Sequence, residues 1–239
     1  MTQNDDPALR ARLRTEKLNR WRKPLTSRRE RLGAWANMFF ADHGFIRVFY
    51  LNLHRISTNA WRSAQPAPYQ IRRMARKGVR TVINLRGGQS YGSLPLEAEA
   101  CADQGIHFEN FVLRSRAIPS VQDIQAAKEL FERIEYPVLF HCKSGADRAG
   151  MMSALYMALH EGRPVSEARN QLSLKYGHFS QGPTGVLDAF FDAYQADQPD
   201  EKMGLMEWVE TRYDQDAITK AFKASGAGAL LTDRILRRE

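Results

Sequence analysis

Short apolar runs alternate with segments of helical periodicity from residue 54 to about residue 194. Residues 79–85 are β-branched and apolar, which is typical of a strand buried on both faces of a sheet. Residues 107–113 and the apolar run that begins at Pro137 predict two further strands, and residues 56–63 predict an opening extended segment. The strands of a central sheet are therefore expected in this part of the chain.

Helices are expected between and after these strands. One inward-facing helix is marked by Ile124, Ala127, Phe131 and Ile134, which recur at the helical period. The other helices are expected at about residues 66–77, 94–104, 147–160, 165–176 and 184–194. This alternation predicts an α/β fold with a central, mostly parallel sheet flanked by helices, and we place this domain at residues 54–196.

Helical extensions are expected on both sides of that domain. Residues 1–53 form a basic, amphipathic N-terminal arm, and residues 197–239 form a C-terminal extension with short helices near 205–209 and 217–222. A glycine-containing break at 225–228 precedes a final basic segment at 230–238. The arm carries its apolar residues at helical spacing, namely Leu32, Trp35, Ala36, Phe39 and Phe40, followed by Phe45, Ile46, Phe49 and Tyr50.

The net charge of +8 is concentrated in the arm. Residues 1–47 hold 11 Lys and Arg against 5 Asp and Glu, which accounts for +6 of the total. The preferred interpretation is that the apolar face of the arm docks on the α/β domain. A basic amphipathic helix on an anionic membrane surface is the alternative. Nucleic-acid binding is a weaker choice because no binding module accompanies the charge.

One stretch combines a reactive side chain with an anion-binding geometry. It connects the strand that begins at Pro137 with a helix and reads His141-Cys142-Lys143-Ser144-Gly145-Ala146-Asp147-Arg148. A loop that opens a helix presents unpaired backbone N–H groups and the positive end of the helix dipole. Gly145 permits a sharp turn, and the planar guanidinium of Arg148 can hold two phosphate oxygens. Such a positive field favours the thiolate of Cys142, a nucleophile placed below a captured phosphate.

This loop resembles the His-Cys-x5-Arg loop of the cysteine-dependent protein tyrosine and dual-specificity phosphatases, in particular their bacterial dual-specificity-like branch. Residues 61–66 and 82–86 also resemble segments that precede the loop in bacterial and inositol-phosphate-type members. The resemblance covers roughly residues 54–195. It implies the tyrosine/dual-specificity phosphatase fold and a metal-independent phosphoric monoester hydrolase that needs no cofactor.

The resemblance also implies a role for each residue of the loop. Cys142 attacks phosphorus, and Arg148 with the loop N–H groups stabilises the equatorial oxygens, so that Lys143, Ser144, Gly145 and Ala146 bind substrate. Water then hydrolyses the cysteinyl-phosphate. His141 orients the loop and Cys142 through hydrogen bonds.

The general acid is the least determined position. Many relatives have an Asp about thirty residues before the cysteine, and residues 111–120 contain no carboxylate. Asp147, directly before Arg148, resembles the in-loop Asp of myotubularin-type and certain broad-specificity bacterial phosphatases, and it is the preferred acid. Asp123, a substrate group or water are the alternatives for the acid. The purely structural explanation of Asp147 is that its carboxylate stabilises the dipole at the N-terminus of the helix.

Other positions bear on the substrate and on turnover. Arg86 and Arg114, with Arg116 and Lys143, are candidates to line the mouth of the site, where they would suit a multiply phosphorylated substrate or an anionic lipid head group. Solvated surface arginines are the equal alternative. His178 could approach the site from the side or could simply end a helix. Ala149 replaces the Ser or Thr of many relatives, whose hydroxyl helps the thiolate leave.

The expected partners are a phosphorylated protein or a phosphoinositide or phospholipid, with peripheral membrane contact through the arm and no nucleic acid. Cys101 and Cys142 do not suggest a disulfide framework, and the mechanism needs Cys142 reduced. No signal peptide and no membrane-spanning run are expected, so we predict a cytoplasmic protein, with the membrane surface as a further location. The rival interpretations are a pseudophosphatase that binds phosphate without turnover and a membrane-surface adaptor.

Overall fold

A single five-stranded sheet forms the centre of the computed structural model, which describes residues 15–16, 21–87 and 91–225. The strand order is β1-β2-β5-β3-β4, and every neighbouring pair is parallel except β1 with β2. The strands are β1 (His54–Arg55), β2 (Ala60–Ala64), β3 (Thr81–Asn84), β4 (His107–Asn110) and β5 (Val138–Cys142). The predicted α/β fold with a mostly parallel sheet is confirmed. The predicted extended segment at 56–63 is instead a turn followed by β2, because Ile56 N–H closes the turn on Ala60 C=O.

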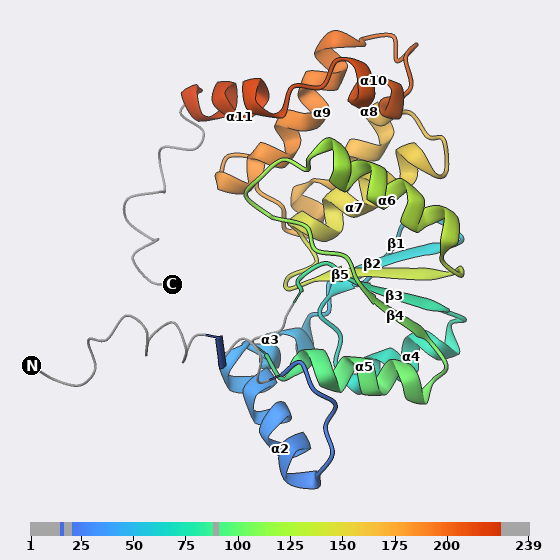
Figure 1. Cartoon of the computed structure of the whole chain (residues 1–239), viewed down its shortest axis with the longest axis vertical. Coiled ribbons are helices and arrows are strands. Elements are labelled where there is room, and N and C mark those ends of the chain that lie inside the picture. The colour runs from blue at the N-terminus through green and yellow to red at the C-terminus, as the bar shows by residue number, and fades with distance from the viewer. Residues whose placement is uncertain (1–14, 17–20, 88–90, 226–239) are drawn as a thin grey trace, which may run out of the picture.

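Helices cover both faces of the sheet (Figure 1). On one face lie α6 (Val121–Arg133), α7 (Asp147–Leu159), α8 (Val165–Ala168) and α9 (Val186–Asp197), and on the other lie α4 (Pro68–Arg76) and α5 (Ser93–Asp103). Strand residues alternate between two apolar clusters, as the period of two requires. Ile83 and Phe140 pack with α6, α7 and α9, whereas Val82 and Leu139 pack with α4 and α5.

One predicted helix is broken. The sequence predicts a continuous helix over residues 165–176, but the structure has α8, a 3-10 turn at Arg169–Gln171 and a second 3-10 turn at Leu174–Tyr176. At Leu172 the backbone leaves the helical region with φ −99° and ψ 86°. This break frees the carbonyl of Gln171, which accepts a hydrogen bond from the buried guanidinium of Arg62. A tertiary contact therefore overrides helical periodicity here.

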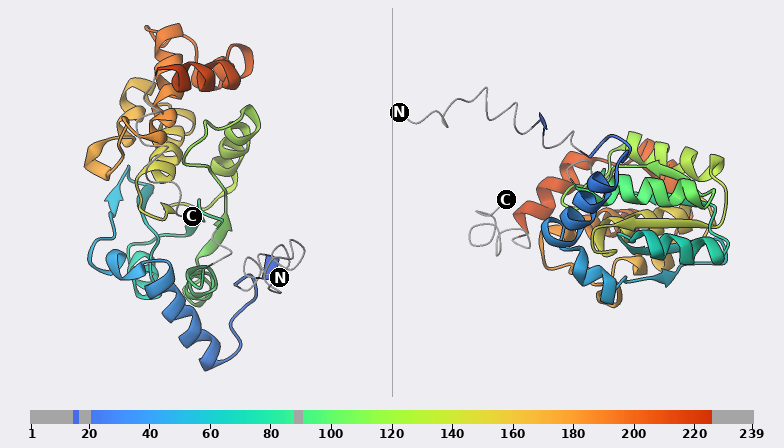
Figure 2. Two further views of the ribbon diagram at one scale, coloured as in Figure 1. Left: turned by 90° about the vertical axis from the view of Figure 1, so that its left-hand side faces the viewer. Right: turned by 90° about the horizontal axis from the view of Figure 1, so that it is seen from below.

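The N-terminal segment packs on the α4–α5 face (Figure 2). It consists of α2 (Arg28–Ala36), a π-helical turn (Asn37–Ala41) and α3 (Gly44–Phe49). Ser27 and Glu30 form a capping box that starts α2. Ala34 and Met38 are buried against Ala67 and Leu96 of the α/β domain. The expected single apolar face of the arm is thus divided, because Trp35 and Phe39 lie partly buried beside this cluster while Leu32 and Phe40 are exposed.

The C-terminal helices pack on the opposite face. α10 (Leu205–Thr211) places Trp208 and Val209 in the main core, and α11 (Gln215–Ala224) follows it. Tyr213 Oη donates to Pro119 C=O at 2.7 Å, which ties this segment to the connection before α6. The predicted break at 225–228 and basic segment at 230–238 lie, apart from Ser225, outside the described residues.

Candidate active site

The Cys142–Arg148 loop connects β5, which ends at Cys142, with α7, which begins at Asp147. Gly145 has φ +76°, and a Cβ atom at this position would lie 2.6 Å from Ala64 N. Both the backbone conformation and the close approach of β2 therefore exclude other residues. The glycine is what allows the chain to reverse between β5 and α7.

Four consecutive carbonyl groups of this loop are held by donors from elsewhere in the domain. Lys143 C=O accepts from Gln65 N–H at 3.4 Å, and Ser144 C=O accepts from Asn52 Nδ2 at 3.0 Å. The next two carbonyls, those of Gly145 and Ala146, both accept from Arg62 Nη2 at 2.8 Å.

This arrangement determines where the loop N–H groups point. In a trans peptide the N–H is directed opposite to the C=O of the same unit. The N–H groups of residues 144–147 are therefore turned away from the donors that bind these carbonyls, toward the other side of the loop. A row of such N–H groups at a helix N-terminus is an anion-binding arrangement.

Arg62 is the central support of the loop, and sequence reasoning assigned it no role. Its side chain is fully buried, lies 4.0 Å above the ring of Tyr176 and also donates to the carbonyl and the side-chain oxygen of Gln171. Burial lowers its pKa to about 10. A buried guanidinium is stabilised when its donors are satisfied. The loop carbonyls satisfy Nη2 and Gln171 satisfies Nη1, whereas Nε has no hydrogen-bond partner among the described residues. The only sequence signal was its place in a strand-like segment, where an arginine is unexpected.

Cys142 and Arg148 occupy the two ends of the loop. Cys142 is buried, whereas Arg148 is half-buried and forms no ion pair with any described residue. Ala149, the departure from many relatives, is buried in the first turn of α7. Ser144 is exposed, and its Oγ accepts from Ala146 N–H at 3.4 Å.

His141 faces a buried polar cluster. Its Nε2 lies 2.9 Å from Glu97 Oε1, and both side chains are fully buried. Gln65 Nε2 donates to the second oxygen of Glu97, and Gln65 Oε1 accepts from Arg86 Nη1 at 2.9 Å. Neither ring nitrogen of His141 has a hydrogen-bond partner among the described residues, so the hydrogen bonds expected of His141 are not formed there. Its link to Arg86 is the close contact with Glu97 followed by the hydrogen bonds of Gln65.

Arg86 is anchored inside the protein by Asp42. Its guanidinium donates to both oxygens of Asp42 at 2.7 and 2.8 Å, and its side chain is only 5% exposed. Arg47 Nη2 also donates to Asp42 at 2.7 Å, and Lys143 Nζ lies 3.9 Å away. Burial raises the pKa of Asp42, but the two guanidinium groups outweigh it and hold that pKa below its usual value. Of the two expectations for Arg86, that of a solvated surface arginine is wrong, because a carboxylate 44 positions earlier binds it.

The other mouth candidates remain at the surface. Arg114 and Arg116 are exposed, and neither forms an ion pair with a described residue. Arg114 lines a cavity of about 450 Å³ together with Asp123 and Met151, and no residue of the Cys142–Arg148 loop is among the residues that line it. Lys143 is partly exposed, and its ammonium lies 5.9 Å from the ring centre of Tyr91.

Asp147 is bound by a buried histidine. His178 Nδ1 lies 2.7 Å from Asp147 Oδ1, and His178 Nε2 lies 2.7 Å from Asp188 Oδ2. Burial alone would lower the pKa of His178, but the hydrogen bonds and charges of the two carboxylates raise it to about 9. The ring is therefore an imidazolium at neutral pH that fixes one oxygen of Asp147 in place. Of the two positions weighed for His178, the structure shows the one beside the loop.

Asp123, the alternative acid, has another partner, and so does the carboxylate of Glu109. Asp123 accepts from the Ser120 backbone N–H at 3.0 Å and from Ser120 Oγ at 2.9 Å, as the third residue of α6 in a capping box whose N-cap is Ser120. Glu109, on β4, accepts from Arg133. No group of three or more His, Cys, Asp and Glu side chains within residues 15–16, 21–87 and 91–225 is placed to hold a metal ion.

Comparison with known proteins identifies the family of this chain. The sequence model of a family described as "DSP-PTPase phosphatase fused to NAD+ Kinase" matches residues 52–183, more than half of the chain. The chain therefore belongs to this family and to the dual-specificity and protein tyrosine phosphatase superfamily, which confirms the resemblance noted from the Cys142–Arg148 loop.

Individual relatives are distant. The chain is 26% identical over 115 residues to the dual-specificity protein phosphatase TpbA of Pseudomonas aeruginosa, and the match covers 47% of this chain and 49% of TpbA. The chain thus spans about half the length of the curated relatives it matches. The crystal structure of P. aeruginosa TpbA matches with a TM-score of 0.48 at 17% identity, covering 72% of this chain and 91% of that one. A phosphatase structure from Shewanella putrefaciens matches with a TM-score of 0.49 at 19% identity, covering 64% and 97%.

Proposed function

We propose that this protein hydrolyses phosphomonoesters through a cysteinyl-phosphate intermediate, without a metal ion. The observation that carries the proposal is the binding of four consecutive loop carbonyls by Gln65, Asn52 and Arg62, which turns the opposing N–H groups toward one side of the loop. An anion-binding loop with a cysteine at its start, and at its end an arginine that forms no ion pair with a described residue, is suited to phosphoryl transfer.

In the first step the Cys142 thiolate attacks phosphorus and forms a P–S bond while the P–O bond to the leaving group breaks. Arg148 and the loop N–H groups bind the equatorial oxygens, whose charge they stabilise in the transition state. Asp147, protonated at this stage while Asp188 carries the charge opposite the imidazolium of His178, gives its proton to the departing oxygen. Its contact with His178 leaves the second carboxyl oxygen of Asp147 available for this role.

In the second step water attacks phosphorus, the P–S bond breaks and the thiolate of Cys142 is regenerated. Asp147, now a carboxylate, takes the proton from that water. Ala149 offers no hydroxyl to stabilise the departing thiolate, so this step is expected to limit the rate. Slow breakdown would appear as a burst of product in pre-steady-state kinetics.

Two substrate classes remain within this proposal. The curated relative is named a dual-specificity protein phosphatase, which supports phosphotyrosine and phosphoserine in proteins. The cations Lys143, Arg114 and Arg116 support inositol phosphates or phospholipids. The alternative function is a phosphate-binding pseudophosphatase, favoured by the absence of a hydroxyl at Ala149.

The decisive experiment measures phosphate release from an aryl phosphate in excess EDTA. We expect turnover by the unmodified chain, none by Cys142→Ser, and a loss of about 10²-fold or more for Arg148→Lys, which keeps the charge but not the planar fork. Activity that survives in Cys142→Ser would contradict the proposed nucleophile. Binding of inorganic phosphate or tungstate without turnover on any phosphomonoester tested would instead establish the pseudophosphatase.

A further inference from the structure

A group of large apolar side chains is exposed on the N-terminal segment. Phe40, Phe45, Ile46, Phe49 and Tyr50 are 80%, 47%, 56%, 90% and 61% exposed, and we refer to these five residues as the aromatic surface. They lie on the π-helical turn, on α3 and, for Tyr50, directly after α3, and the two helical elements contact each other. Scattered exposed apolar residues are common, but several within eleven consecutive positions indicate a surface that is covered in use.

The aromatic surface lies beside the catalytic loop. Tyr50 Oη donates to Asn52 Oδ1 at 3.2 Å, and Asn52 Nδ2 in turn donates to Ser144 C=O at 3.0 Å. On the other side of α3, Asp42 lies 3.9 Å from the ammonium of Lys143. The aromatic surface is therefore close to the Cys142–Arg148 loop, through Asn52 on the carbonyl side of the loop and through Asp42 beside Lys143.

The charge around this surface is strongly positive. Residues 21–77 contain 12 Lys and Arg but only Glu30 and Asp42 as acids. Arg47 and Arg62 are buried and Arg31 pairs with Glu99, so the remaining cations are those at or near the surface. The exposed ones include Lys23, Arg28, Arg29, Arg55, Arg72, Arg73, Arg76 and Lys77.

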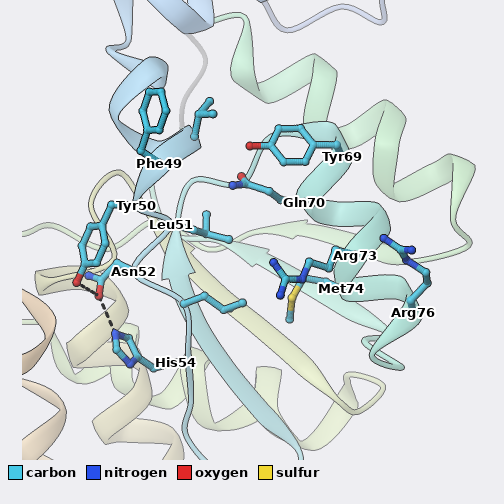
Figure 3. A pocket seen from close by; sticks show the side chains of 12 residues that line it. Phe49, Tyr50, Leu51, Asn52, His54, Tyr69, Gln70, Arg73, Met74 and Arg76 are labelled. Atoms are coloured by element: carbon cyan, nitrogen blue, oxygen red, sulfur yellow. Dashed lines mark hydrogen bonds between the residues drawn. The ribbon is translucent and has the colours of Figure 1, made fainter.

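Aromatic and cationic side chains meet at one hollow (Figure 3). It has a volume of about 520 Å³ and lies between α3 and α4, and Phe49, Tyr69, Arg73 and Arg76 are among the residues that line it. An anionic partner with an apolar interior would satisfy both kinds of side chain. Arginine and tyrosine side chains can bury their apolar parts while the polar ends reach head groups.

We propose that the aromatic surface and the cations of α4 bind an anionic membrane, which brings the Cys142–Arg148 loop to phosphomonoester head groups at the bilayer surface. The delivery of the loop to phosphomonoester head groups rests on the proposed phosphatase function, whereas the binding to an anionic membrane does not. Phenylalanine side chains on short helices insert about 5–10 Å into the head-group region, and nearby cations add attraction to anionic lipids. None of the helices in the described part of the chain is long and apolar enough to cross a membrane, so this would be a surface contact.

Charge complementarity favours a bilayer over a second copy of this chain. A two-fold interface built on the aromatic surface would bring two strongly basic segments together, which like-charge repulsion opposes. A protein partner would need an acidic rim of matching shape. An anionic bilayer supplies negative charge over its whole area.

The test uses the full chain and sedimentation with sucrose-loaded vesicles. We expect binding to phosphatidylcholine vesicles that contain 30% phosphatidylglycerol and at least tenfold weaker binding to pure phosphatidylcholine. Phe40→Ser/Phe49→Ser should weaken binding to the anionic vesicles at least tenfold. Arg72→Gln/Arg73→Gln should weaken it less, and binding should fall with added salt.

Val112→Ser/Leu174→Ser is the matched control, because these side chains are 57% and 68% exposed elsewhere on the chain. It should bind like the unmodified chain, and all variants should keep their thermal unfolding and their turnover of a soluble aryl phosphate. Equal vesicle binding by the phenylalanine variant, or no binding by the unmodified chain, overturns the proposal. Self-association that only the phenylalanine variant loses, without vesicle binding, assigns the surface to a second copy and also overturns it.

The sedimentation measurement is separate from catalysis. Cys142→Ser should bind anionic vesicles like the unmodified chain, since Cys142 is buried and lies outside the aromatic surface. Vesicle binding without any turnover would refute the phosphatase function but leave the membrane contact intact. Turnover without vesicle binding would refute the membrane contact but leave the phosphatase function intact.

Discussion

At the scale of single residues, the geometry of the candidate site depends on a side chain that touches no reacting atom. Arg62 binds the carbonyls of Gly145 and Ala146 and so controls the direction of the next two N–H groups. The same guanidinium stacks on Tyr176 and binds Gln171. One buried arginine therefore connects β2, the loop and the segment after α8.

Replacement of Arg62 by lysine should impair both activity and stability. Lysine keeps the charge but cannot satisfy four acceptors in a plane, so the loop carbonyls lose their donors. We expect kcat/KM to fall about 10²-fold and the free energy of unfolding to fall by about 3 kcal/mol, as measured by steady-state kinetics and urea denaturation. Arg55→Lys is the matched control, because exposed Arg55 also donates to two backbone carbonyls, and its loss should cost under about 0.5 kcal/mol. Equal effects of the two substitutions would refute the role of Arg62.

The contact between Asp147 and His178 leads to a prediction about proton transfer. If Asp147 is the general acid, Asp147→Asn should slow the hydrolysis of alkyl and phenyl phosphates by about 10²–10⁴-fold. Esters of very acidic phenols should be affected far less, because their leaving groups need no proton. His178→Gln should show the same dependence on the leaving group to a smaller degree. A uniform loss for every ester would mean that Asp147 only supports the helix.

His178 also makes stability depend on pH. Its pKa is about 9 in the folded protein and 6.5 in the unfolded chain, so its contribution is fully present below pH 6.5 and is lost as pH rises through about 9. The contribution amounts to at most about 3 kcal/mol. Urea denaturation between pH 6 and pH 9.5 should show this decline in the unmodified chain and a flatter profile in His178→Gln. Parallel profiles would contradict protonation of His178 in the folded state.

At the scale of elements, the β5–α7 connection depends on a backbone conformation. Gly145 combines φ +76° with an approach of 2.6 Å to Ala64 N, so a Cβ atom there must displace β2. No change of side-chain rotamer can relieve the positive φ or the contact of a Cβ atom with the β2 backbone. The geometry of the strand, the loop and the helix is thus set jointly by this residue.

Gly145→Ala should therefore abolish most of the activity. We expect at least a 10³-fold loss in kcat/KM, because N–H groups misplaced by even 1 Å no longer fit the transition state. Gly105→Ala is the control, since it has φ +64° with nothing within 4 Å of its added Cβ. It should lose only about 1 kcal/mol of stability and retain full kcat/KM. Retained activity in Gly145→Ala would refute the proposed loop geometry.

At the scale of the whole molecule, the N-terminal segment is joined to the active site through buried charge. Asp42 lies between α2 and α3, and its carboxylate binds Arg86 and Arg47. Arg86 donates a hydrogen bond to Gln65, and Gln65 donates one to Glu97. The other oxygen of Glu97 lies 2.9 Å from Nε2 of His141, the residue before Cys142. We therefore propose that Asp42, although it precedes the α/β domain, is a positioning residue for the Cys142–Arg148 loop.

Asp42→Asn should test this coupling. Two guanidinium groups would lose their carboxylate inside the protein, so we expect about 3–5 kcal/mol of destabilisation. Hydrogen exchange should increase over residues 28–50, and kcat/KM should fall. Asp200→Asn, which breaks the exposed Asp200–Lys202 pair, should change stability by less than about 0.5 kcal/mol. A silent Asp42→Asn would mean that packing alone holds the segment.

Much of the fold was predictable from local pattern. The strands at β3, β4 and β5 and the helices α4 to α7 fall within a few residues of the predicted ranges, because buried parallel strands and amphipathic helices carry their period in the sequence. The segment after α8 was not predictable, since the contact of Gln171 with Arg62 spans 109 positions.

What the sequence determined by itself is the strand–loop–helix unit with its cysteine, glycine and arginine, since these elements are local and their chemistry depends on fixed spacing. Only the tertiary structure decided that Arg62 orients the loop, that Arg86 forms a buried ion pair with Asp42 and that His178 is hydrogen-bonded to Asp147. Those pairings join positions 31 to 84 residues apart. An ion pair or a buried hydrogen bond depends on the distance between two groups in space and on their burial. The separation of the two residues along the chain determines neither of these quantities.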